Sequence, residues 1–323
     1  MTTDTNLPRR RLGHTGIEVG AIGLGCMGMT WAYGSAGRDD VRSAAVIHRA
    51  IELGITLIDT ADMYGPFTNE EVVGAALAGR RDEVVLATKV GLVVEDVATF
   101  KMVRDGRPEH VREGIDASLG RLGTDHVDLY QLHRVDEDVP VEETWGALAE
   151  VVAAGKARAI GMSEVTVEQL EVAHAIHPVA SVQSELSLWT RDRLDDVLPW
   201  CRANGVAFIP FAPLGRGYLT GTVTPGSFGD GDFRARNPRF TREALDANLA
   251  IVDRVRAVAE RHGATAAQVA LAWVLAQDAL VVPIPGTTKP ERVAENAGAA
   301  RLALAAEDLA DLDAAPPAVG ARY

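Results

Sequence analysis

Short apolar segments that alternate with helical stretches constrain the fold of this chain more than any other feature of its sequence. Eight such segments follow one another, beginning at Ala21, Ile55, Val84, Val127, Ala157, Val179, Val206 and Val281. Because each is apolar on both faces, it belongs in a parallel sheet that helices cover on both sides. Eight successive units in 323 residues predict a closed (β/α)8 TIM barrel. An open, doubly wound α/β sheet has the same alternation and is the alternative.

Apolar spacing and capping residues mark the helices between these segments. The expected helices span residues 39–53, 68–78, 108–122, 141–154, 166–177, 194–204, 242–262, 265–278 and 290–300. Thr68 with Glu71, and Thr166 with Gln169, form capping-box pairs at two of the helix starts. A β-hairpin is predicted between Arg9 and Gly20. Neither a linker nor a shift in composition divides the chain, so we expect one barrel domain over residues 1–323.

Charge and cysteine content narrow the class of protein. A net charge of -13 argues against nucleic acid or an anionic membrane as the main partner. The two cysteines, Cys26 and Cys201, are too few for a disulfide framework and fit a reducing compartment. The start of the chain is polar, and no apolar run approaches the length of a membrane span. We therefore expect a soluble cytoplasmic protein that does not bind a membrane.

A glycine pattern between Gly23 and Gly28 matches the G-x-G-x-x-G motif of dinucleotide-binding Rossmann units. That motif requires a helix that begins inside it, because the pyrophosphate binds at the helix N-terminus. No helical periodicity appears here before Asp39. We therefore favour the alternative that these glycines end a strand where the backbone approaches a ligand or a neighbouring strand.

Ionisable residues follow three consecutive strands of the predicted barrel. Asp59 ends the second strand, with Tyr64 just beyond it, Lys89 ends the third, and His133 ends the fourth. Taken singly, each has an ordinary structural explanation, such as a helix cap for the aspartate or a solvent-reaching side chain for the lysine. Because the C-terminal ends of barrel strands meet at one mouth, their combination favours an active site.

These four side chains suit the reduction of a carbonyl group. The pKa of tyrosine is near 10, and we expect the ammonium group of Lys89 to lower it, while Asp59 keeps Lys89 charged. Tyr64 then serves as the general acid, and His133 orients the carbonyl oxygen. A cofactor must supply the hydride, because no side chain does so. No cluster with metal-ligand spacing is present, so no bound metal is expected.

The sequence resembles the aldo-keto reductase superfamily over essentially the whole chain. The segments that carry the resemblance are Asp59–Gly65, Thr88–Lys89, Gln131–His133, Gly155–Ser163, Pro213–Gly217 and Ile284–Thr288. The resemblance implies an eight-stranded barrel whose bottom is closed by the initial hairpin. It also implies NADPH/NADP+ as cofactor, an aldehyde or ketone as substrate, and the catalytic tetrad Asp59, Tyr64, Lys89 and His133.

A cofactor site is also indicated by the residues between Pro285 and Arg292. Thr288 and Glu291 are spaced as a capping box, so a helix is expected to begin at the mouth of the barrel. A helix N-terminus attracts anions. Lys289 and Arg292 add positive charge, which favours the 2′-phosphate of NADPH over NADH.

The resemblance implies further cofactor-binding residues: Met27, Gly28, Ser163, Glu164, Gln183, Phe211, Ala212, Pro213, Leu214, Gly215, Gly217, Gly286, Thr287, Thr288, Glu295 and Asn296. Ser163 and Gln183 match positions that hold the nicotinamide carboxamide, and Phe211 matches an aromatic residue that stacks on the ring. Three positions depart from common relatives: Glu164 stands where many have Asn, Ala212 where Ser is frequent, and Gly286 where Lys is frequent. Backbone amides of Leu214, Gly215 and Gly217 are expected to serve as donors in place of the missing hydroxyl. Glu295 and Asn296 are expected near the adenine.

Three aromatic residues are candidates for the substrate pocket. Trp31, Tyr33 and Trp189 either line an apolar pocket or simply pack the loops. The loop 92–107 and the tail 316–323 are expected to complete the pocket. Two other functions fit a barrel: a cofactor-sensing regulatory subunit of the potassium-channel β type, and a metal-dependent hydrolase. Hydride transfer to carbonyl compounds distinguishes the enzyme from the first, and bound metal distinguishes it from the second.

Overall fold

A parallel β-sheet forms the centre of the molecule in the computed structural model, which describes residues 7–33, 38–229 and 231–322. Its strands are β3 (Leu24–Gly25), β4 (Leu57–Asp59), β5 (Val85–Val90), β8 (Val127–Leu132), β9 (Ala157–Ser163), β10 (Ser181–Glu185) and β11 (Ala207–Phe211). These seven strands pair in parallel and in chain order. The predicted (β/α)8 barrel is confirmed, and the open doubly wound sheet is wrong because both edges meet an eighth segment.

The eighth segment, predicted as a strand from Val281 to Pro285, closes the barrel through isolated bridges only. Residue Val281 bridges Phe208 on one side, and Gly286 bridges Gly25 on the other. The N–H groups of Val282 and Ile284 donate to the backbone of β11. The alternate positions are prolines 283 and 285, which have no N–H to donate toward β3. A regular ladder therefore cannot form on that side.

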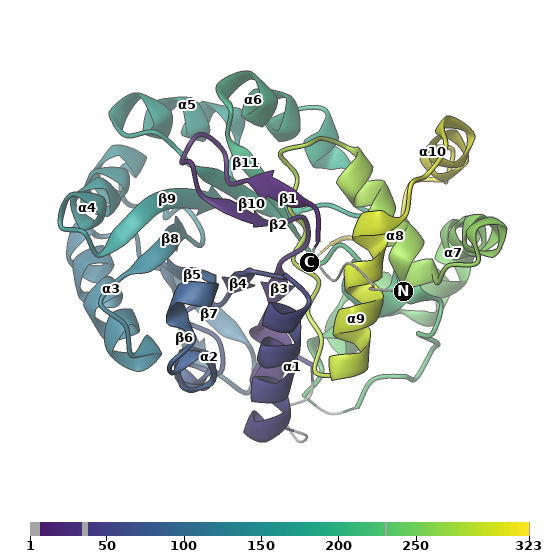
Figure 1. The fold of residues 1–323 in the computed structure, drawn as a ribbon, viewed down its shortest axis with the longest axis horizontal. Coiled ribbons are helices and arrows are strands. Elements are labelled where there is room, and N and C mark those ends of the chain that lie inside the picture. Colours follow the sequence, from purple (N-terminus) through teal and green to yellow (C-terminus); the bar gives the residue numbers. More distant parts are fainter. Residues whose placement is uncertain (1–6, 34–37, 230, 323) are drawn as a thin grey trace.

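Helices surround the sheet, most of them as a ring (Figure 1). They are α1 (Asp40–Glu52), α2 (Thr68–Leu77), α3 (Pro108–Leu122), α4 (Val141–Ala153), α5 (Val167–Ile176), α6 (Val197–Asn204), α7 (Arg242–His262), α8 (Ala266–Ala276), α9 (Pro290–Gly298) and α10 (Ala306–Asp313). α3 and α7 have the predicted bounds, the other predicted helices begin or end within a few residues of theirs, and α10 was not predicted. None of the helices in the described part of the chain is long and apolar enough to cross a membrane.

The predicted hairpin lies across the barrel, shown in purple in Figure 1, and closes its bottom. β1 (Arg9–Arg11) pairs with β2 (Glu18–Gly20) in antiparallel register. Gly13 at its turn lies so close to the backbone before β10 and β11 that an added Cβ would be 2.6 Å from the carbonyl oxygen of Ala180. Its φ of +59° is also one that glycine adopts most easily. Closure of the bottom directs any ligand to the opposite mouth.

Two buried apolar layers hold the barrel together. Inside it, Leu57, Leu129 and Ile209 of the sheet pack with Leu12 and Val19 of the hairpin. Outside it, alternate strand residues pack against the helices in a larger cluster. This division follows from the strands being apolar on both faces. The mouth holds a third, smaller cluster of aromatic and aliphatic residues.

Several local predictions differ from the structure. The capping box of Thr166 and Gln169 is present, but the one predicted for Thr68 and Glu71 is wrong, because α2 begins after Phe67 without a side-chain cap. The hydroxyl of Thr68 instead donates to the carbonyl oxygen of Gly65 in the preceding turn. The loop 92–107 also contains an unpredicted hairpin, formed by β6 (Leu92–Asp96) and β7 (Lys101–Arg104).

The glycine motif near the start does not open a Rossmann helix. Residues Met27–Met29 form a single 3-10 turn. A Cβ on Gly25 would lie 2.9 Å from the carbonyl oxygen of Ile284, so glycine is needed where the first strand approaches the closing segment. The Rossmann alternative is therefore wrong, and the close approach of backbones is confirmed.

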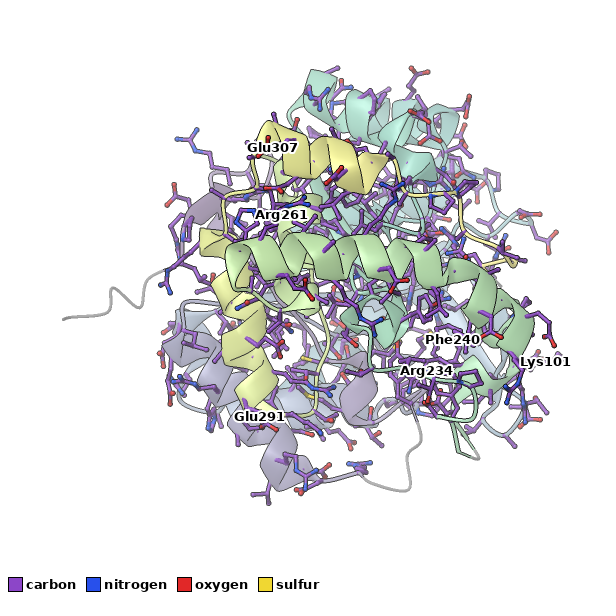
Figure 2. All side chains as sticks on the ribbon, turned by 90° about the vertical axis from the view of Figure 1, so that its right-hand side faces the viewer. Lys101, Arg234, Phe240, Arg261, Glu291 and Glu307 are labelled. Carbon is purple, nitrogen blue, oxygen red and sulfur yellow. The ribbon has the colours of Figure 1, made fainter. Side chains whose placement is uncertain are left out.

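Two of these helices, α7 and α10, lie outside the ring that the others form, at one side of the barrel (Figure 1). Figure 2 shows α10 beside the long α7, with Arg261 on the face between them. Arg261 pairs with Asp308 at 2.8 Å, which ties the two helices together. The residues labelled Arg234 and Phe240 lie at the opposite end of α7, where a long irregular segment leads from β11 toward the mouth.

Candidate active site

A cavity of about 620 Å³ opens at the C-terminal ends of the strands. Strand-end residues from around the barrel line it: Gly25, Asp59, His133, Ser163, Gln183 and Phe211. At one end it reaches aromatic side chains of the first loop, and at the other it reaches the start of α9. The convergence predicted for the strand ends is therefore present in the structure.

The four residues predicted as the catalytic tetrad lie together at the floor of this cavity. The Nζ atom of Lys89 donates to Asp59 Oδ1 at 2.5 Å and to the carbonyl oxygen of Thr60 at 2.8 Å. It also lies 3.4 Å from the hydroxyl of Tyr64. The rings of Tyr64 and His133 meet edge to face, with centroids 5.7 Å apart. One phenol and one imidazole thus face the cavity above a buried ion pair.

Lys89 is completely buried, yet its surroundings keep it charged. Burial by itself lowers the pKa of this amine, but Asp59 and Tyr64 more than offset that effect, so the pKa of Lys89 is raised above its usual value. Asp59 is fixed in turn, because its Oδ2 atom accepts from Gln183 Nε2 at 2.8 Å and from Gln131 Nε2 at 3.3 Å. The predicted pairing of Asp59 with Lys89 is confirmed.

The pKa of Tyr64 departs from the expectation. Burial raises it, and the ammonium group of Lys89 lowers it only in part, so the net pKa lies above the usual value. The prediction of a lowered pKa is wrong because the side chain is only 8% exposed and its phenolate would lose solvation. Tyr64 is therefore protonated at neutral pH.

His133 is neutral at neutral pH. Burial, together with the charges of Arg134 and Lys89, lowers its pKa well below the usual value. Among the described residues, its buried Nδ1 atom has no hydrogen-bond partner. A neutral imidazole keeps one N–H donor and one acceptor, so this ring can donate a hydrogen bond to a neutral oxygen without adding charge to the site.

Asp62, in the turn that follows β4, is buried close to the tetrad. Its backbone carbonyl accepts from the N–H of Phe67 in the turn that follows β4. Burial and the neighbouring Glu70 raise the pKa of its carboxyl group to about 8. Its Oδ1 atom has no hydrogen-bond partner among the described residues. The side chain is therefore mostly protonated at neutral pH.

Most of the residues expected at a cofactor line the cavity. These are Met27, Gly28, Ser163, Gln183, Phe211, Ala212, Pro213, Leu214, Gly217, Gly286, Thr287, Thr288, Arg292, Glu295 and Asn296. Glu164, Gly215 and Lys289 are outside the lining. Glu164 turns toward the C-terminal tail, and Lys289 is exposed just before α9. Of the two cations expected near a 2′-phosphate, the structure brings Arg292 to the cavity.

The start of α9 is built differently from the prediction. The capping box of Thr288 and Glu291 is wrong, because the helix begins after Lys289 without a side-chain cap. Instead, the N–H of Lys289 donates to the hydroxyl of Thr287 at 3.1 Å. The helix N-terminus still lies at the mouth, with Arg292 in its first turn, so positive charge is available to an anion there.

The segment after β11 has an unusual backbone. Ala212 and Arg216 have φ of +47° and +54°, values that non-glycine residues rarely adopt. The N–H groups of Gly215 and Gly217 donate to the carbonyls of Ala212 and Leu214. These two amides, expected as donors to a cofactor, are thus engaged within the turn. Strained backbone of this kind is concentrated at ligand sites.

The opposite end of the cavity is apolar. Trp31 and Phe100 meet edge to face at 5.1 Å, and Tyr33 meets Phe233 at 5.4 Å. Trp31 and Tyr33, expected at the substrate, line the cavity, but Trp189 does not. Trp189 is stacked on Tyr218 at 4.7 Å beneath the segment after β11. Trp189 therefore packs a loop, which was the alternative to lining the substrate pocket.

Two other elements were expected to complete the pocket. The 92–107 loop lines it through Leu92, Phe100 and Met102. Within the described part of the tail 316–323, no residue is among the lining. Tyr323 lies outside the described residues. The tail packs behind the site instead, where Arg322 contacts Glu164.

Sequence reasoning missed several residues of the lining: Met63, Arg134, Arg216, Phe233, Arg234 and Thr265–Ala267. Met63 and Arg134 adjoin tetrad residues, so their proximity was a usable signal. Arg216 lies inside the Pro213–Gly217 segment that carried the family resemblance. Phe233, Arg234 and Thr265 come from irregular or distant segments, and no spacing rule marks them. Across the described residues, no three of His, Cys, Asp or Glu gather as metal ligands.

Comparisons with known proteins agree with this geometry. The model of the Aldo/keto reductase family matches residues 21–316. The "Probable aldo-keto reductase 1" of Glycine max is 42% identical over 325 residues, which cover 99% of this chain and 93% of that protein. These matches extend over the strand ends that form the cavity.

Solved structures are similar over nearly their whole length. A glycerol dehydrogenase from Gluconobacter oxydans is 32% identical with a TM-score of 0.86, covering 96% of this chain and 95% of its own. An aldo/keto reductase from Klebsiella pneumoniae, solved in complex with NADP and acetate, is 29% identical with a TM-score of 0.73, covering 97% of both chains. With the barrel, the strand-end tetrad and a family match over almost all of its length, this chain belongs to the aldo/keto reductase family.

Proposed function

We propose that this protein is an NADPH-dependent reductase that converts an aldehyde or ketone to the alcohol, with Tyr64 as the general acid. The observation that carries the proposal is the contact of the buried Lys89 with both Asp59 and Tyr64, directly below an open cavity. The NADP complex of the Klebsiella pneumoniae relative supports the choice of cofactor.

The residues of this chain fit a dinucleotide. The cavity extends from the tetrad past Ser163 and Gln183 to Arg292 and Asn296 at α9, so it is elongated as an extended dinucleotide requires. Ser163 and Gln183 are buried strand-end side chains with hydrogen-bonding groups, which suits a carboxamide. Arg292 supplies a guanidinium group, which favours a phosphate monoester at the far end.

Bound NADPH supplies the hydride that reduces the carbonyl carbon. The remaining steps belong to side chains of this chain. Neutral His133 orients the carbonyl oxygen by hydrogen bonding, and protonated Tyr64 donates its phenolic proton to that oxygen as negative charge develops there. The ammonium group of Lys89, 3.4 Å away, then stabilises the phenolate that remains. Asp59 keeps Lys89 charged throughout.

Substrate size follows from the apolar end of the cavity. Trp31, Met63, Leu92, Phe100 and Phe233 form a wall on the far side of Tyr64. Apolar pockets with a few convergent polar groups bind ligands whose body is apolar and whose one polar group is fixed. We therefore propose carbonyl compounds with an aromatic or alkyl body.

The buried thiols of Cys26 and Cys201 fit a reducing compartment and support a cytoplasmic location.

The decisive experiment is the substitution Tyr64→Phe. It removes the proton donor and leaves the cavity intact, so reduction of a panel of aldehydes and ketones should fall by about 10² to 10⁴. Binding of NADPH, followed by quenching of tryptophan fluorescence, should remain within about twofold of the original protein. Turnover close to that of the original protein would refute the role of Tyr64. Failure of the original protein to bind NADPH would refute the cofactor assignment.

A further inference from the structure

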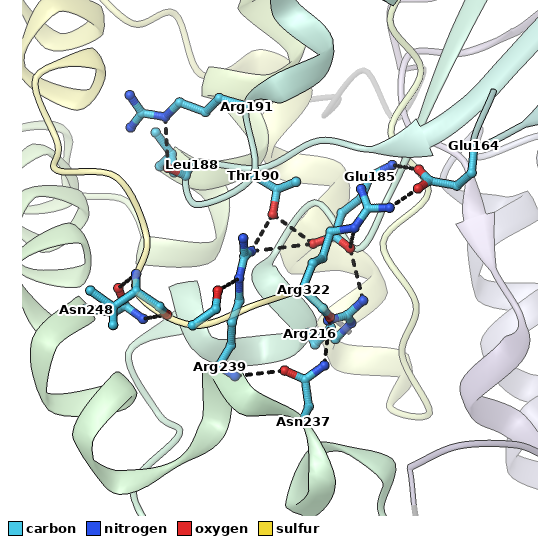
Figure 3. Close-up of polar contacts among 12 residues, drawn as sticks. Glu164, Glu185, Leu188, Thr190, Arg191, Arg216, Asn237, Arg239, Asn248 and Arg322 are labelled. Atoms are coloured by element: carbon cyan, nitrogen blue, oxygen red, sulfur yellow. Dashed lines mark hydrogen bonds and ion pairs between the residues drawn. The ribbon is translucent and has the colours of Figure 1, made fainter. Parts of the chain in front are cut away.

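The described end of the C-terminal tail is fixed behind the strand ends by a set of polar contacts (Figure 3). Val319 exchanges two backbone hydrogen bonds with the side chain of Asn248. The carbonyl oxygen of Gly320 accepts from Arg239 at 3.2 Å. The carbonyl oxygen of Arg322 accepts from Arg216 at 3.1 Å and from Asn237 at 2.8 Å. These contacts fix where the side chain of Arg322 begins.

From there, the guanidinium group of Arg322 reaches two carboxylates at the ends of neighbouring strands. Its Nη2 atom forms an ion pair with Glu164, which directly follows β9. Its Nε atom lies 3.7 Å from Glu185, the last residue of β10. Figure 3 shows the guanidinium group between the two carboxylates. A tail residue thus spans two strands of the barrel.

Glu164 in turn holds the segment that carries Ser163 and Gln183. Its φ is +56°, which is unusual for a residue other than glycine. Its N–H donates to the carbonyl oxygen of Gln183 at 3.0 Å, and its Oε1 atom accepts from the N–H of Glu185 at 2.9 Å. Gln183 also donates to Asp59 of the tetrad. One continuous set of contacts therefore leads from Arg322 to the floor of the cavity.

Glu185 and Glu164 differ in the arginines that compensate their negative charges. Glu185 contacts Arg216 at 3.0 Å and Arg239 at 3.9 Å, besides Arg322. Glu164 has its ion pair with Arg322, and its side chain is only 7% exposed. A carboxylate this deeply buried requires a counter-charge. Loss of Arg322 would leave Glu185 compensated by two arginines and would leave Glu164, next to Ser163, without its counter-charge.

We propose that Arg322 is a positioning residue of the cofactor site, acting through Glu164 to neutralise and fix the strand end beside the nicotinamide. The inference rests on the proposed function, in which Ser163 and Gln183 hold the carboxamide. It also gives the acidic residue at position 164 a role: Glu164 contacts the tail and the backbone of β10, and is not itself a ligand of the cofactor. Arg322 thereby sets the balance between the two redox forms of the cofactor, since the oxidised ring is cationic and the reduced ring is neutral.

The test compares dissociation constants of NADPH and NADP+ by quenching of tryptophan fluorescence. In Arg322→Gln, the unpaired Glu164 attracts the cationic ring, so the ratio of the NADPH constant to the NADP+ constant should rise at least about threefold. In the double variant with Glu164→Gln, the ratio should return to within about twofold of its original value. Arg322→Lys, which retains the charge, should remain near the original protein.

Arg239→Gln is the matched control. It removes another arginine from the same cluster, one that contacts Glu185, Thr190 and the carbonyl oxygen of Gly320. A purely structural role of the cluster predicts that both arginine variants lower the unfolding temperature and leave the ratio unchanged, and this result would overturn the inference. A shift in Arg322→Gln alone, reversed by Glu164→Gln, supports it. If the original protein binds neither nucleotide, the proposed function fails, and the inference fails with it.

Discussion

Lys89 lies between Asp59 and Tyr64, with its Nζ atom 2.5 Å from the carboxylate and 3.4 Å from the phenol. Replacing Lys89 with Met removes the charge that, in the proposed mechanism, stabilises the phenolate of Tyr64, and it leaves Asp59 buried without its cation. We expect turnover to fall by about 10² to 10⁴ and the free energy of unfolding to fall by about 3–5 kcal/mol. Steady-state kinetics and urea unfolding measure the two effects.

The double variant Asp59→Asn with Lys89→Met separates stability from catalysis. It removes both buried charges together, so most of the lost stability should return. Turnover should remain low, because no cation lies beside Tyr64. Recovery of turnover along with stability would contradict the role given to Lys89.

The pH dependence of reduction follows from the same group of residues. The pKa of Tyr64 is raised above its usual value by burial, and Lys89 lowers it only in part. Tyr64, the proposed proton donor, is therefore protonated at every pH below the ordinary tyrosine pKa of about 10. We expect kcat/KM for reduction to stay level from neutral pH upward and to decline only beyond that value. A decline centred near pH 8 in a pH–rate profile would contradict this expectation.

Much of this site was predictable because strand order fixes where strand ends meet. Asp59, Lys89 and His133 each follow an apolar run, and a closed barrel brings such positions to one mouth. α3 was predicted to the residue because Pro108 occupies its first turn and Gly123 ends it in the left-handed conformation. These signals are local, so tertiary contacts do not override them.

What escaped prediction depends on contacts between distant segments. Glu164 and Arg322 are 158 residues apart, and no spacing rule joins them. The stacking of Trp189 on Tyr218 likewise depends on how the segment after β11 folds back. The sign of the pKa shift of Tyr64 depends on the depth of burial, which the sequence does not contain. The capping box at Thr68 is wrong because Phe67 is the N-cap residue and Thr68 is already the first residue of α2, with its hydroxyl donating to the carbonyl oxygen of Gly65.

Asp62 gives the protein a stability that falls with rising pH. Burial and Glu70 raise the pKa of its carboxyl group to about 8 in the folded state, against about 3.9 when unfolded. The folded state therefore holds a proton that the unfolded state has lost between these values. The contribution of Asp62 to the free energy of unfolding is fully present below pH 4. It declines as pH rises, and about 5 kcal/mol of it is lost by pH 8. Urea unfolding of the nucleotide-free protein at pH 5 and 8 measures it.

The variant Asp62→Asn tests whether Asp62 causes this pH dependence of stability. The amide cannot ionise, so the loss of stability between pH 5 and pH 8 should shrink markedly in this variant. Asp128→Asn serves as the control, because Asp128 is equally buried but pairs with Arg81 and Arg158 at 2.8 and 2.7 Å. Asp128→Asn should lower the free energy of unfolding both at pH 5 and at pH 8. An unchanged pH dependence in Asp62→Asn would assign the effect to other groups.

The preference for NADPH should depend more on Arg292 than on Lys289. Arg292 lines the cavity, whereas Lys289 is exposed outside the lining. A charge-assisted hydrogen bond contributes about 1.5–3 kcal/mol, so Arg292→Gln should weaken NADPH by about 10- to 100-fold. NADH, which lacks the 2′-phosphate, should change by less than about twofold. Lys289→Gln is the control and should have the smaller effect; equal losses for both nucleotides in Arg292→Gln would contradict the assignment.

Phe100 should contribute to substrate affinity without contributing to cofactor affinity. It lies in the turn between β6 and β7 and packs edge to face on Trp31 at the apolar end of the cavity. Phe100→Ala removes an aromatic contact of about 1.5–3 kcal/mol, so KM for an aromatic aldehyde should rise about tenfold or more. The dissociation constant of NADPH should be unchanged.

Trp189 provides the contrast to Phe100, because it is buried against Tyr218 and Phe240 away from the cavity lining. Trp189→Phe removes part of a packed core, so it should lower the free energy of unfolding by about 1–3 kcal/mol and leave KM within about twofold. If Trp189→Phe instead raised KM while Phe100→Ala did not, the apolar end of the cavity would not be the substrate pocket. The pair of variants therefore distinguishes an aromatic residue that contacts substrate from one that only packs a loop, an alternative that sequence alone leaves open for both Trp31 and Trp189.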